Sequence, residues 1–339
     1  FLIEAAPLVK NTVFLIGGIG PDTEKYKKMI VNMGLQDKVF LIGKVADEEL
    51  PSYYSAADIF CFPSIEKNEA FGVSQLESMD FEVIQFSSVD GDISDINFTE
   101  RYENTKFFHV FHLAAKTFVP DSWKNPIDFY KSAVLGTINI LQLCSAKKIP
   151  LTYVSAYLYG IPENLPINEE HRVRPNNPYA HSKFLAEDLC KFYSKFYDVN
   201  ISIVRPFNVY GKGQKKTFLI PFIIDQVLHK ETIKIKDLNP KRDYIYLDDL
   251  VRGLINTLNG KEKFSIFNLG SGASLSVSEI IQIIQKVAGT NKKVVSEEKE
   301  RYNEIMNVVA DIKKSKKYLD WVPAYNFEEG IKEILKKEI

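Results

Sequence analysis

Short apolar segments alternate with amphipathic segments along almost the whole chain. A short apolar run is typical of a strand, and apolar residues three or four positions apart are typical of a helix. The predicted strands are Thr12–Ile16, Lys38–Ile42, Asp58–Phe62, Glu82–Phe86, Phe107–Leu113, Leu151–Ser155, Ile201–Arg205 and Phe264–Asn268. The predicted helices are Asp22–Met33, Asp47–Ala56, Gly72–Met79, Pro126–Lys147, Pro178–Tyr197 and Val277–Val287. This alternation predicts an α/β fold with a doubly wound parallel sheet and helices on both faces.

The composition is that of an ordinary globular protein and argues against several functional classes. The 339 residues suffice for one large or two ordinary domains, and 45% of them are hydrophobic. A net charge of −1 gives no reason to expect nucleic acid or an anionic membrane as a partner. No apolar run reaches the roughly 18–20 residues that a membrane span needs. The chain begins with Phe1, which we interpret as the start of a truncated sequence.

The three cysteines are far apart in the sequence. Cys61, Cys144 and Cys190 lack the paired spacing of a disulfide framework or a zinc site. We therefore expect no metal and a reducing compartment, the cytoplasm.

A tyrosine and a lysine four residues apart are the strongest candidates for chemistry. Tyr179 and Lys183 would share one face of the predicted helix Pro178–Tyr197, so that the ammonium can approach the phenol. A free tyrosine has a pKa of about 10, too high for a base at neutral pH. We expect a neighbouring cation, together with a positive nicotinamide ring, to lower the pKa of Tyr179.

A serine is predicted to join this pair. Ser155 ends a predicted strand, and the carboxyl ends of parallel strands are where such sheets bind ligands. Its hydroxyl could bond the same substrate oxygen whose proton Tyr179 exchanges. Ser155, Tyr179 and Lys183 would then form one proton-handling group beside a hydride acceptor.

Further motifs surround this group in a fixed order. They are His112-Leu-Ala-Ala115, Ser155…Tyr159-Gly160, Asn177-Pro-Tyr-Ala-His-Ser-Lys183, Arg205-Pro-Phe-Asn-Val-Tyr-Gly211, Lys241-Arg-Asp-Tyr-Ile-Tyr-Leu-Asp-Asp249 and Asn268-Leu-Gly-Ser-Gly272. In order and spacing these motifs resemble the extended short-chain dehydrogenases, the nucleotide-sugar epimerases and dehydratases, over residues 80–339. The resemblance implies a Rossmann-like sheet and a small C-terminal α/β part that binds substrate. It also implies a nucleotide-diphospho-sugar substrate, tightly held NAD (NADP is not excluded) and a homodimer.

The resemblance assigns roles to individual residues. Ser155, Tyr179 and Lys183 would be catalytic, with Tyr179 as the acid and base. The residues that would contact the cofactor are Asp92, Ile93, Leu113, Ala114, Ala115, Tyr179, Lys183 and Pro206. Those that would hold the substrate are Asn208, Arg242 and Arg301. His112 is expected to be a packed strand residue, and Arg242 could alternatively pair with Asp243, Asp248 or Asp249.

Two positions bear on the reaction. A dehydratase of this family normally has an acidic residue beside the catalytic hydroxyl, but Ala156 and Tyr157 follow Ser155. This favours a 4-epimerase over a dehydratase. The family also usually has an asparagine where this chain has Ala133, so one supporting polar contact would be missing.

The first 79 residues resemble a different family. Leu15-Ile-Gly-Gly-Ile-Gly-Pro21, Val39-Phe-Leu-Ile-Gly43, Pro63-Ser64 and the pair Glu69 and Glu77 are similar to the donor-binding domain of retaining glycosyltransferases with two Rossmann-like domains. The acceptor domain of those enzymes is not represented, so no transfer activity is expected.

This segment stands where an extended dehydrogenase has its glycine-rich turn, and no such turn precedes Glu82. Because that turn brings backbone amides to the cofactor's pyrophosphate, we predict weakened NAD affinity. The expected domains are 1–79, glycosyltransferase-like, and 80–339, dehydrogenase-like. In the latter, the NAD part would span about 80–205 and 240–270, and the substrate part about 206–239 and 271–339. A glycosyltransferase fragment and a fusion without catalytic activity remain the alternatives to an epimerase.

Overall fold

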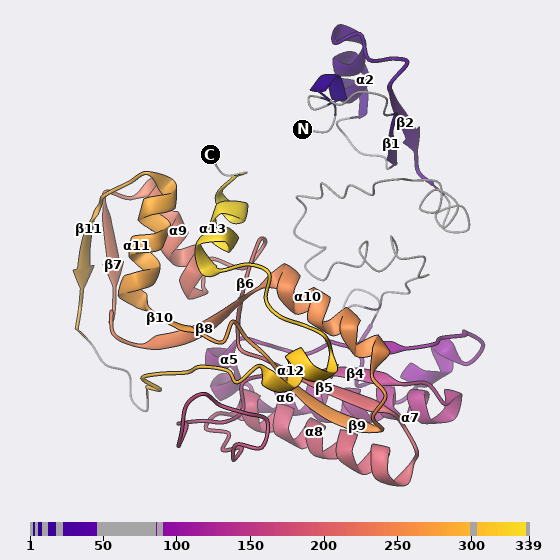
Figure 1. Ribbon diagram of the computed structural model, residues 1–339. Coiled ribbons are helices and arrows are strands. Elements are labelled where there is room, and N and C mark those ends of the chain that lie inside the picture. The colour runs from indigo at the N-terminus through magenta and orange to yellow at the C-terminus, as the bar shows by residue number, and fades with distance from the viewer. Residues whose placement is uncertain are drawn as a thin grey trace. The chain divides into compact units, whose positions relative to one another are not determined.

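The computed structural model describes residue 3 and residues 6–8, 13–17, 23–45, 86, 91–298 and 304–336 (Figure 1). The chain divides into two compact units, Phe1–Gln85 and Phe86–Ile339.

The N-terminal unit contains a parallel pair of strands beside a helix. Its elements are η1 (Ala6–Leu8), β1 (Phe14–Gly17), α2 (Thr23–Asn32) and β2 (Val39–Gly43). Phe14 lies opposite Val39 in the parallel β1–β2 pair, and Ile30 and Leu35 are buried beside it. The first three predicted elements are therefore confirmed. The predictions for 47–56, 58–62 and 72–79 lie outside the described residues, as does the predicted strand Glu82–Phe86 except for Phe86.

A four-stranded parallel sheet forms the centre of the second unit. It has the order β3-β4-β5-β9 and consists of β3 (Val110–His112), β4 (Leu151–Val154), β5 (Ile201–Pro206) and β9 (Phe264–Leu269). Every adjacent pair in this sheet is parallel, which confirms the predicted fold class.

Strand β3 is shorter than the predicted Phe107–Leu113. Its first amide, that of Val110, donates to the carbonyl of Pro150 at 3.1 Å. Strand β4 begins only at Leu151, because Pro150 has no N–H to donate. Residues 107–109 therefore have no partner in β4 with which to extend the ladder.

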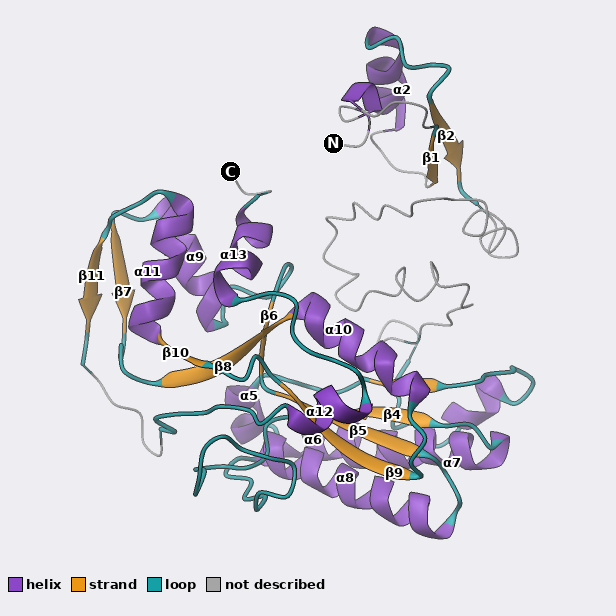
Figure 2. Ribbon diagram, viewed as in Figure 1, coloured by secondary structure: helices purple, strands orange, loops and turns teal. Residues whose placement is uncertain are grey.

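Helices cover both faces of this sheet (Figures 1 and 2). Figure 2 shows α7 (Gly136–Lys147) and α8 (Pro178–Phe196) on one face and α10 (Leu247–Asn256) on the other. The remaining elements near the sheet are η2 (Phe98–Tyr102), α5 (Val119–Lys124), α6 (Pro126–Tyr130), η3 (Lys131–Leu135) and η4 (Thr257–Asn259). The predicted helix Pro126–Lys147 is thus a continuous helical stretch, but η3 is a π-helical turn in its middle.

Helix α8 begins where its sequence directs. The side chain of Asn177 accepts a hydrogen bond from the amide of Ala180 at 2.9 Å, and Pro178 occupies the first helical position. An N-cap asparagine followed by proline satisfies one of the unpaired amides of the first turn and presets the backbone. The helix start fixes Tyr179 and Lys183 in its first two turns.

A smaller α/β part follows the sheet. It contains a three-stranded sheet of β6 (Asn208–Tyr210), β8 (Lys241–Tyr246) and β10 (Ser274–Ser276), and a parallel pair of β7 (Thr232–Ile235) and β11 (Lys293–Ser296). Its helices are α9 (Leu219–His229), α11 (Val277–Ala288), α12 (Lys313–Tyr318) and α13 (Phe327–Leu335). Apolar side chains of α9, α11 and α13 form one core with β7.

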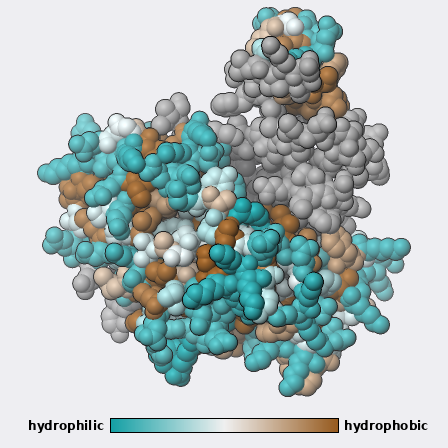
Figure 3. Space-filling view, in the orientation of Figure 1, coloured by the Kyte–Doolittle hydropathy of each residue, from teal (hydrophilic) through white to brown (hydrophobic). Residues whose placement is uncertain are grey.

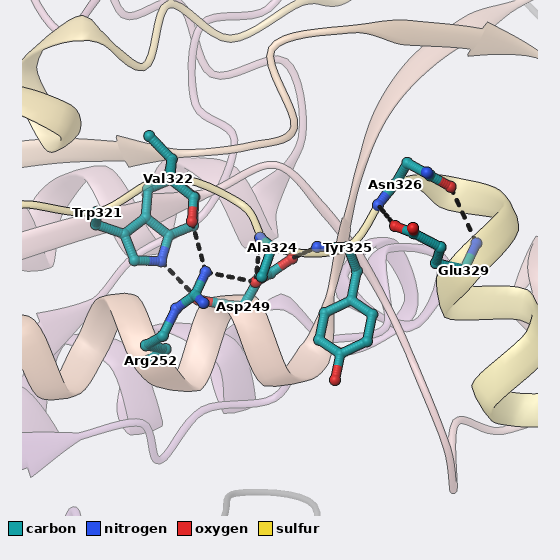
Figure 4. Close-up of polar contacts among 8 residues, drawn as sticks. All are labelled: Asp249, Arg252, Trp321, Val322, Ala324, Tyr325, Asn326 and Glu329. Carbon is teal, nitrogen blue, oxygen red and sulfur yellow. Dashed lines mark hydrogen bonds and ion pairs between the residues drawn. The ribbon is translucent and has the colours of Figure 1, made fainter.

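A buried carboxylate fixes the C-terminal segment to α10 (Figure 4). Asp249 is 1% exposed and accepts hydrogen bonds from the amides of Ala324 at 2.8 Å and Tyr325 at 3.0 Å. Arg252 pairs with the same carboxylate at 2.7 Å, and the indole of Trp321 donates to the Asp249 carbonyl at 2.9 Å. The segment that leads into α13 is therefore held by side chains of α10.

On the face shown in Figure 3, hydrophobic residues form small groups among hydrophilic ones over the described part of the chain. Among the described residues, no helix combines the length and apolar character needed to span a bilayer.

Candidate active site

Ser155 and the first turns of α8 meet at the carboxyl edge of the central sheet. Ser155 directly follows β4, and its amide donates to the carbonyl of Val204 in β5 at 2.8 Å. Leu113, Ala114 and Ala115 follow β3 at the same edge, and Pro206 ends β5 there. The predicted catalytic and cofactor-binding segments therefore come from the strand ends at which open α/β sheets bind ligands.

Ser155 carries a buried hydroxyl without a partner. The residue is 3% exposed, and its Oγ makes no hydrogen bond within the described part of the chain. An unsatisfied buried polar group costs roughly 1–3 kcal/mol, so native proteins rarely keep one without a reason. A substrate hydroxyl or carbonyl would satisfy it.

Lys183 is buried in the second turn of α8. Its Nζ donates to the carbonyl of Val154 at 2.7 Å and lies 4.8 Å from the centroid of the Tyr153 ring. Burial lowers the pKa of Lys183 to about 8, and the negative charge of Glu187 opposes that shift. The ammonium group is thus anchored to the last residue of β4, next to Ser155.

Tyr179 lies one turn before Lys183, and its ring meets Phe129 edge-on at 6.3 Å between centroids. Burial raises the pKa of Tyr179 to about 12. The direction is opposite to the one expected from the lysine and a nicotinamide together. The protein alone therefore keeps this phenol protonated, because desolvation disfavours the phenolate.

His112 is a packed strand residue, as expected. It is 2% exposed, and its Nε2 lies 2.9 Å from Thr137 Oγ1. Burial, and to a smaller extent the nearby positive charge of Lys183, lowers the pKa of His112 to about 3. The imidazole is therefore neutral and serves as a polar contact between β3 and α7.

The predicted adenine-contacting pair lies in a tight turn. The exposed Asp92 accepts hydrogen bonds from the amide and hydroxyl of Ser94 at 2.9 and 2.8 Å, which lower the pKa of its carboxyl. Ile93 is buried in the core beneath the sheet. Asn139 of α7 donates to the carbonyls of Ile93 and Asp95, a contact that sequence reasoning did not find.

Two of the predicted substrate-binding residues lie in the smaller α/β part. Asn208 begins β6 and donates to the carbonyl of Asp243 in β8 at 3.0 Å. Arg242 is half-buried in β8 and forms an ion pair with Glu304. Arg301 lies outside the described residues.

The expected alternative partners of Arg242 were wrong. Its guanidinium also donates to the carbonyl of Ile305, because the chain at residues 304–306 returns alongside β8. The Asp243 carboxylate instead accepts hydrogen bonds from Ser271, Gly272 and Ala310. The Asp249 carboxylate is occupied by the C-terminal segment.

A buried ion pair below the site was also missed from the sequence. Arg205 at the end of β5 donates through Nε and Nη2 to the two carboxylate oxygens of Glu187 in α8, at 2.9 and 2.6 Å. Its third contact is the hydroxyl of Tyr159, at 3.0 Å. The sequence did contain signals for this pair. Arg205 begins the Arg-Pro motif, and Glu187 follows Lys183 by one helical turn.

Ala133 lies buried in the π-helical turn η3 and offers no polar side chain there. π-Helical turns of this kind are frequent at functional sites. The glycosyltransferase-like residues Glu69 and Glu77, with Pro63 and Ser64, lie outside the described residues.

Two family profiles match this chain. That of the family described as GDP-mannose 4,6 dehydratase matches residues 62–334, and that of glycosyl transferases group 1 matches residues 1–103. The two matches overlap over residues 62–103. They agree with both resemblances that the sequence motifs indicated.

Curated relatives and solved structures point the same way. The chain is 33% identical over 254 residues to a putative UDP-glucose 4-epimerase of Methanocaldococcus jannaschii, which covers 73% of this chain and 82% of that protein. It is 32% identical over 275 residues to a UDP-glucuronate 4-epimerase of Thermodesulfobacterium geofontis, with 79% of each covered. A UDP-glucose 4-epimerase from Brucella ovis, solved in complex with NAD, aligns with a TM-score of 0.66 and 26% identity over 72% of this chain and 82% of that one.

The dehydratase-family profile covers well over half of the chain, and the relatives include sugar-nucleotide 4-epimerases. The chain therefore belongs to the GDP-mannose 4,6 dehydratase family of NAD-dependent nucleotide-sugar epimerases and dehydratases, and its N-terminal segment matches group 1 glycosyl transferases.

Proposed function

We propose that this protein is an NAD-dependent 4-epimerase of a nucleotide-diphospho-sugar. The observation that carries the proposal is the buried hydroxyl of Ser155, which has no hydrogen-bond partner among the described residues. It follows Val154, whose carbonyl binds Lys183, and Tyr179 lies one turn before Lys183 in α8. The names of the relatives, UDP-glucose and UDP-glucuronate 4-epimerases, support the reaction class. When bound, NAD supplies the hydride acceptor that this reaction needs.

Each catalytic residue has a defined task in this proposal. Tyr179 takes the proton of the sugar's 4-hydroxyl and returns it to the same oxygen after the sugar ring has turned over. Ser155 donates a hydrogen bond to that oxygen and keeps it in reach of the phenol. Lys183, held by the Val154 carbonyl, provides the nearby positive charge that favours the phenolate.

The remaining predicted residues would hold the two ligands. Leu113, Ala114, Ala115 and Pro206 would line the cofactor site at the strand ends, with Asp92 and Ile93 at its adenine end. Asn208, Arg242 and Arg301 would hold the substrate's phosphates and nucleotide, where a guanidinium matches phosphate geometry. We retain 1–79 and 80–339 as the proposed domains.

The other reactions have less support. A dehydratase would need an acid beside Ser155, where Ala156 and Tyr157 stand. A glycosyltransferase would need an acceptor domain that the matched segment 1–103 does not supply. We also propose a cytoplasmic location, because Cys144 and Cys190 are free buried thiols, as a reducing compartment favours.

The decisive experiment compares wild type with Tyr179→Phe. The purified protein is incubated with NAD and UDP-glucose or UDP-glucuronate, and the epimeric product is separated by chromatography. We expect Tyr179→Phe to lower the rate by roughly 10²- to 10⁴-fold, because it removes the proton acceptor but keeps the ring. Tyr197→Phe, at the exposed end of the same helix, is the matched control. An unchanged rate in Tyr179→Phe, or no epimer from wild type with either sugar, would contradict the proposal.

We further propose that the protein is a homodimer that pairs through the outer faces of α5–α6 and α8. Trp123 in α5 and Ile127 in α6 are 65% and 67% exposed. Phe192 and Phe196 are 49% and 61% exposed and lie one turn apart, on α8. Exposed apolar groups of this kind often mark an interface between proteins.

Ile127→Asp combined with Phe196→Asp tests the dimer. We expect sedimentation velocity to show a dimer for wild type and a monomer for the double variant, because two desolvated carboxylates would oppose the contact. Phe222→Asp, on an exposed position of α9, controls for a general loss of solubility. A wild type that sediments as a monomer would rule the dimer out.

A further inference from the structure

We propose that Asn139 is a positioning residue for the cofactor: it fixes the turn that carries Asp92 and Ile93, and so presents them to the adenine end of NAD. The inference rests on the proposed function, because Asp92 and Ile93 are taken to contact the cofactor. Asn139 itself does not touch the cofactor in this proposal; it acts through the backbone of the turn.

The contacts of Asn139 are specific and reach far along the chain. It lies on α7 and is 8% exposed. Its Nδ2 donates to the carbonyl of Ile93 at 2.8 Å and to the carbonyl of Asp95 at 2.7 Å. Both donors of the side-chain amide are used, and the two carbonyls flank the Ser94–Asp95 peptide.

The turn is short and closely packed. Asp92 accepts from the amide and hydroxyl of Ser94, and the amide of Asp95 donates to the Asp92 carbonyl at 3.1 Å. Gly91 has a φ of +147°, and a Cβ there would lie 2.6 Å from the guanidinium of Arg101. Gly91 therefore has a backbone conformation, and a neighbour, that a residue with a side chain would not tolerate just before Asp92.

Helix α7 approaches the turn closely enough for the short asparagine side chain to reach it. A Cβ at Gly136 would lie 2.6 Å from Cγ2 of Ile93, so glycine permits the contact. Asn139 follows Gly136 by three residues and therefore lies on the same side of the helix. One face of α7 thus holds the turn by packing at Gly136 and by hydrogen bonds at Asn139.

Loss of these bonds should release the turn without removing any group that touches the cofactor. Two carbonyls would lose their donors, and the segment after Gly91 would gain backbone freedom. NAD would then have to order the segment on binding, which lowers affinity. Because two hydrogen bonds are lost, we expect the dissociation constant for NAD to rise about tenfold.

The test measures NAD binding to the full chain by calorimetry, with UDP as the second ligand. Asn139→Leu removes both donors at similar size, and Asn139→Ala is the milder second variant should Asn139→Leu fail to fold. Asn256→Leu is the matched control, because Asn256 also donates to a main-chain carbonyl, that of Leu319, at 2.9 Å. Hydrogen exchange is followed at residues 91–98, where the amides of Ser94, Asp95 and Phe98 are bonded within the turn.

We expect the Asn139 variants to bind NAD about tenfold more weakly, with unchanged UDP affinity and faster exchange at these amides, and Asn256→Leu to resemble wild type. The inference is overturned if the folded Asn139 variants bind NAD like wild type, or if NAD and UDP affinities fall together. A wild type that binds no NAD overturns the proposed function and this inference with it. If wild type binds NAD and the Asn139 variants bind it equally well, only the inference is overturned.

Discussion

Tyr179 and Lys183 lie in the first two turns of α8. Burial shifts the pKa of each residue in the direction that favours its uncharged form. It raises the pKa of Tyr179 to about 12 and lowers that of Lys183 to about 8. In the protein without cofactor, the pKa of Tyr179 therefore favours the protonated phenol at neutral pH. The second positive charge that the proposed reaction needs is that of the oxidised nicotinamide ring.

His112 gives a pH-dependent test at the same scale. Its folded pKa of about 3 lies below the unfolded value near 6.5, so the folded protein binds fewer protons between these values. Stability is then lost as the pH falls through 6.5 toward 3, by about 2 kcal/mol at pH 5. Glutamine does not titrate in this range. Between pH 7 and pH 5 we therefore expect the free energy of unfolding of His112→Gln to fall by about 2 kcal/mol less than that of wild type.

Urea denaturation at the two pH values measures this difference. The exposed His229→Gln is the control and should follow wild type. Equal losses in wild type and His112→Gln would show that the buried imidazole does not contribute to acid sensitivity.

Local spacing made some site residues predictable and left others out of reach. Tyr179 and Lys183 could be paired because a helix fixes the geometry of residues four apart. Glu304, the partner of Arg242, could not be found, because only the path of the folded chain brings residues 304–306 beside β8. The rise in the pKa of Tyr179 in the protein alone was likewise not predicted, because it depends on burial by residues distant in sequence.

Between elements, the pair of Arg205 and Glu187 joins the end of β5 to α8. The side chain of Arg205 is 4% exposed and that of Glu187 is 5% exposed. Removing one partner of a buried pair typically costs about 3–5 kcal/mol because the other charge is left unpaired. We expect Glu187→Leu and Arg205→Met each to lower the free energy of unfolding by about this amount.

The double variant is the informative control. With both charges gone, we expect it to recover much of the lost stability, so that urea denaturation shows a strongly non-additive cycle. Additive losses would mean that the pair contributes only through its separate packing contacts.

The sequence predicted the helices and the central strands more accurately than it predicted the irregularities within them. Pro178 after Asn177 marks the start of α8, and the apolar runs mark β4, β5 and β9. The π-helical turn at Lys131–Leu135 was not predicted from the apolar pattern.

For the whole molecule, the two family matches overlap in the region where an extended dehydrogenase has its glycine-rich turn. The dehydratase-family match begins at residue 62 and the glycosyl transferase match ends at residue 103. Both resemblances could be recognised from motifs, since each family uses short segments in fixed order. The contribution of the segment between Gly43 and Phe86 to cofactor binding could not be predicted from motifs, because the matches to both families extend into this segment.

That segment sets the last prediction. By sequence position, Glu66 and Glu69 precede Glu82 where the family has its glycine-rich turn, and carboxylates near a pyrophosphate would repel it. We therefore expect the purified protein to retain less than one NAD per chain after gel filtration, measured as nucleotide released on denaturation. The UDP-glucose 4-epimerase from Brucella ovis, whose structure holds NAD, is the reference under the same procedure. If the chain retains one NAD per molecule like the reference, the glycine-rich turn is dispensable here. If it binds NAD only when the cofactor is added in excess, the strand-end site is intact and the lost turn accounts for the lower affinity.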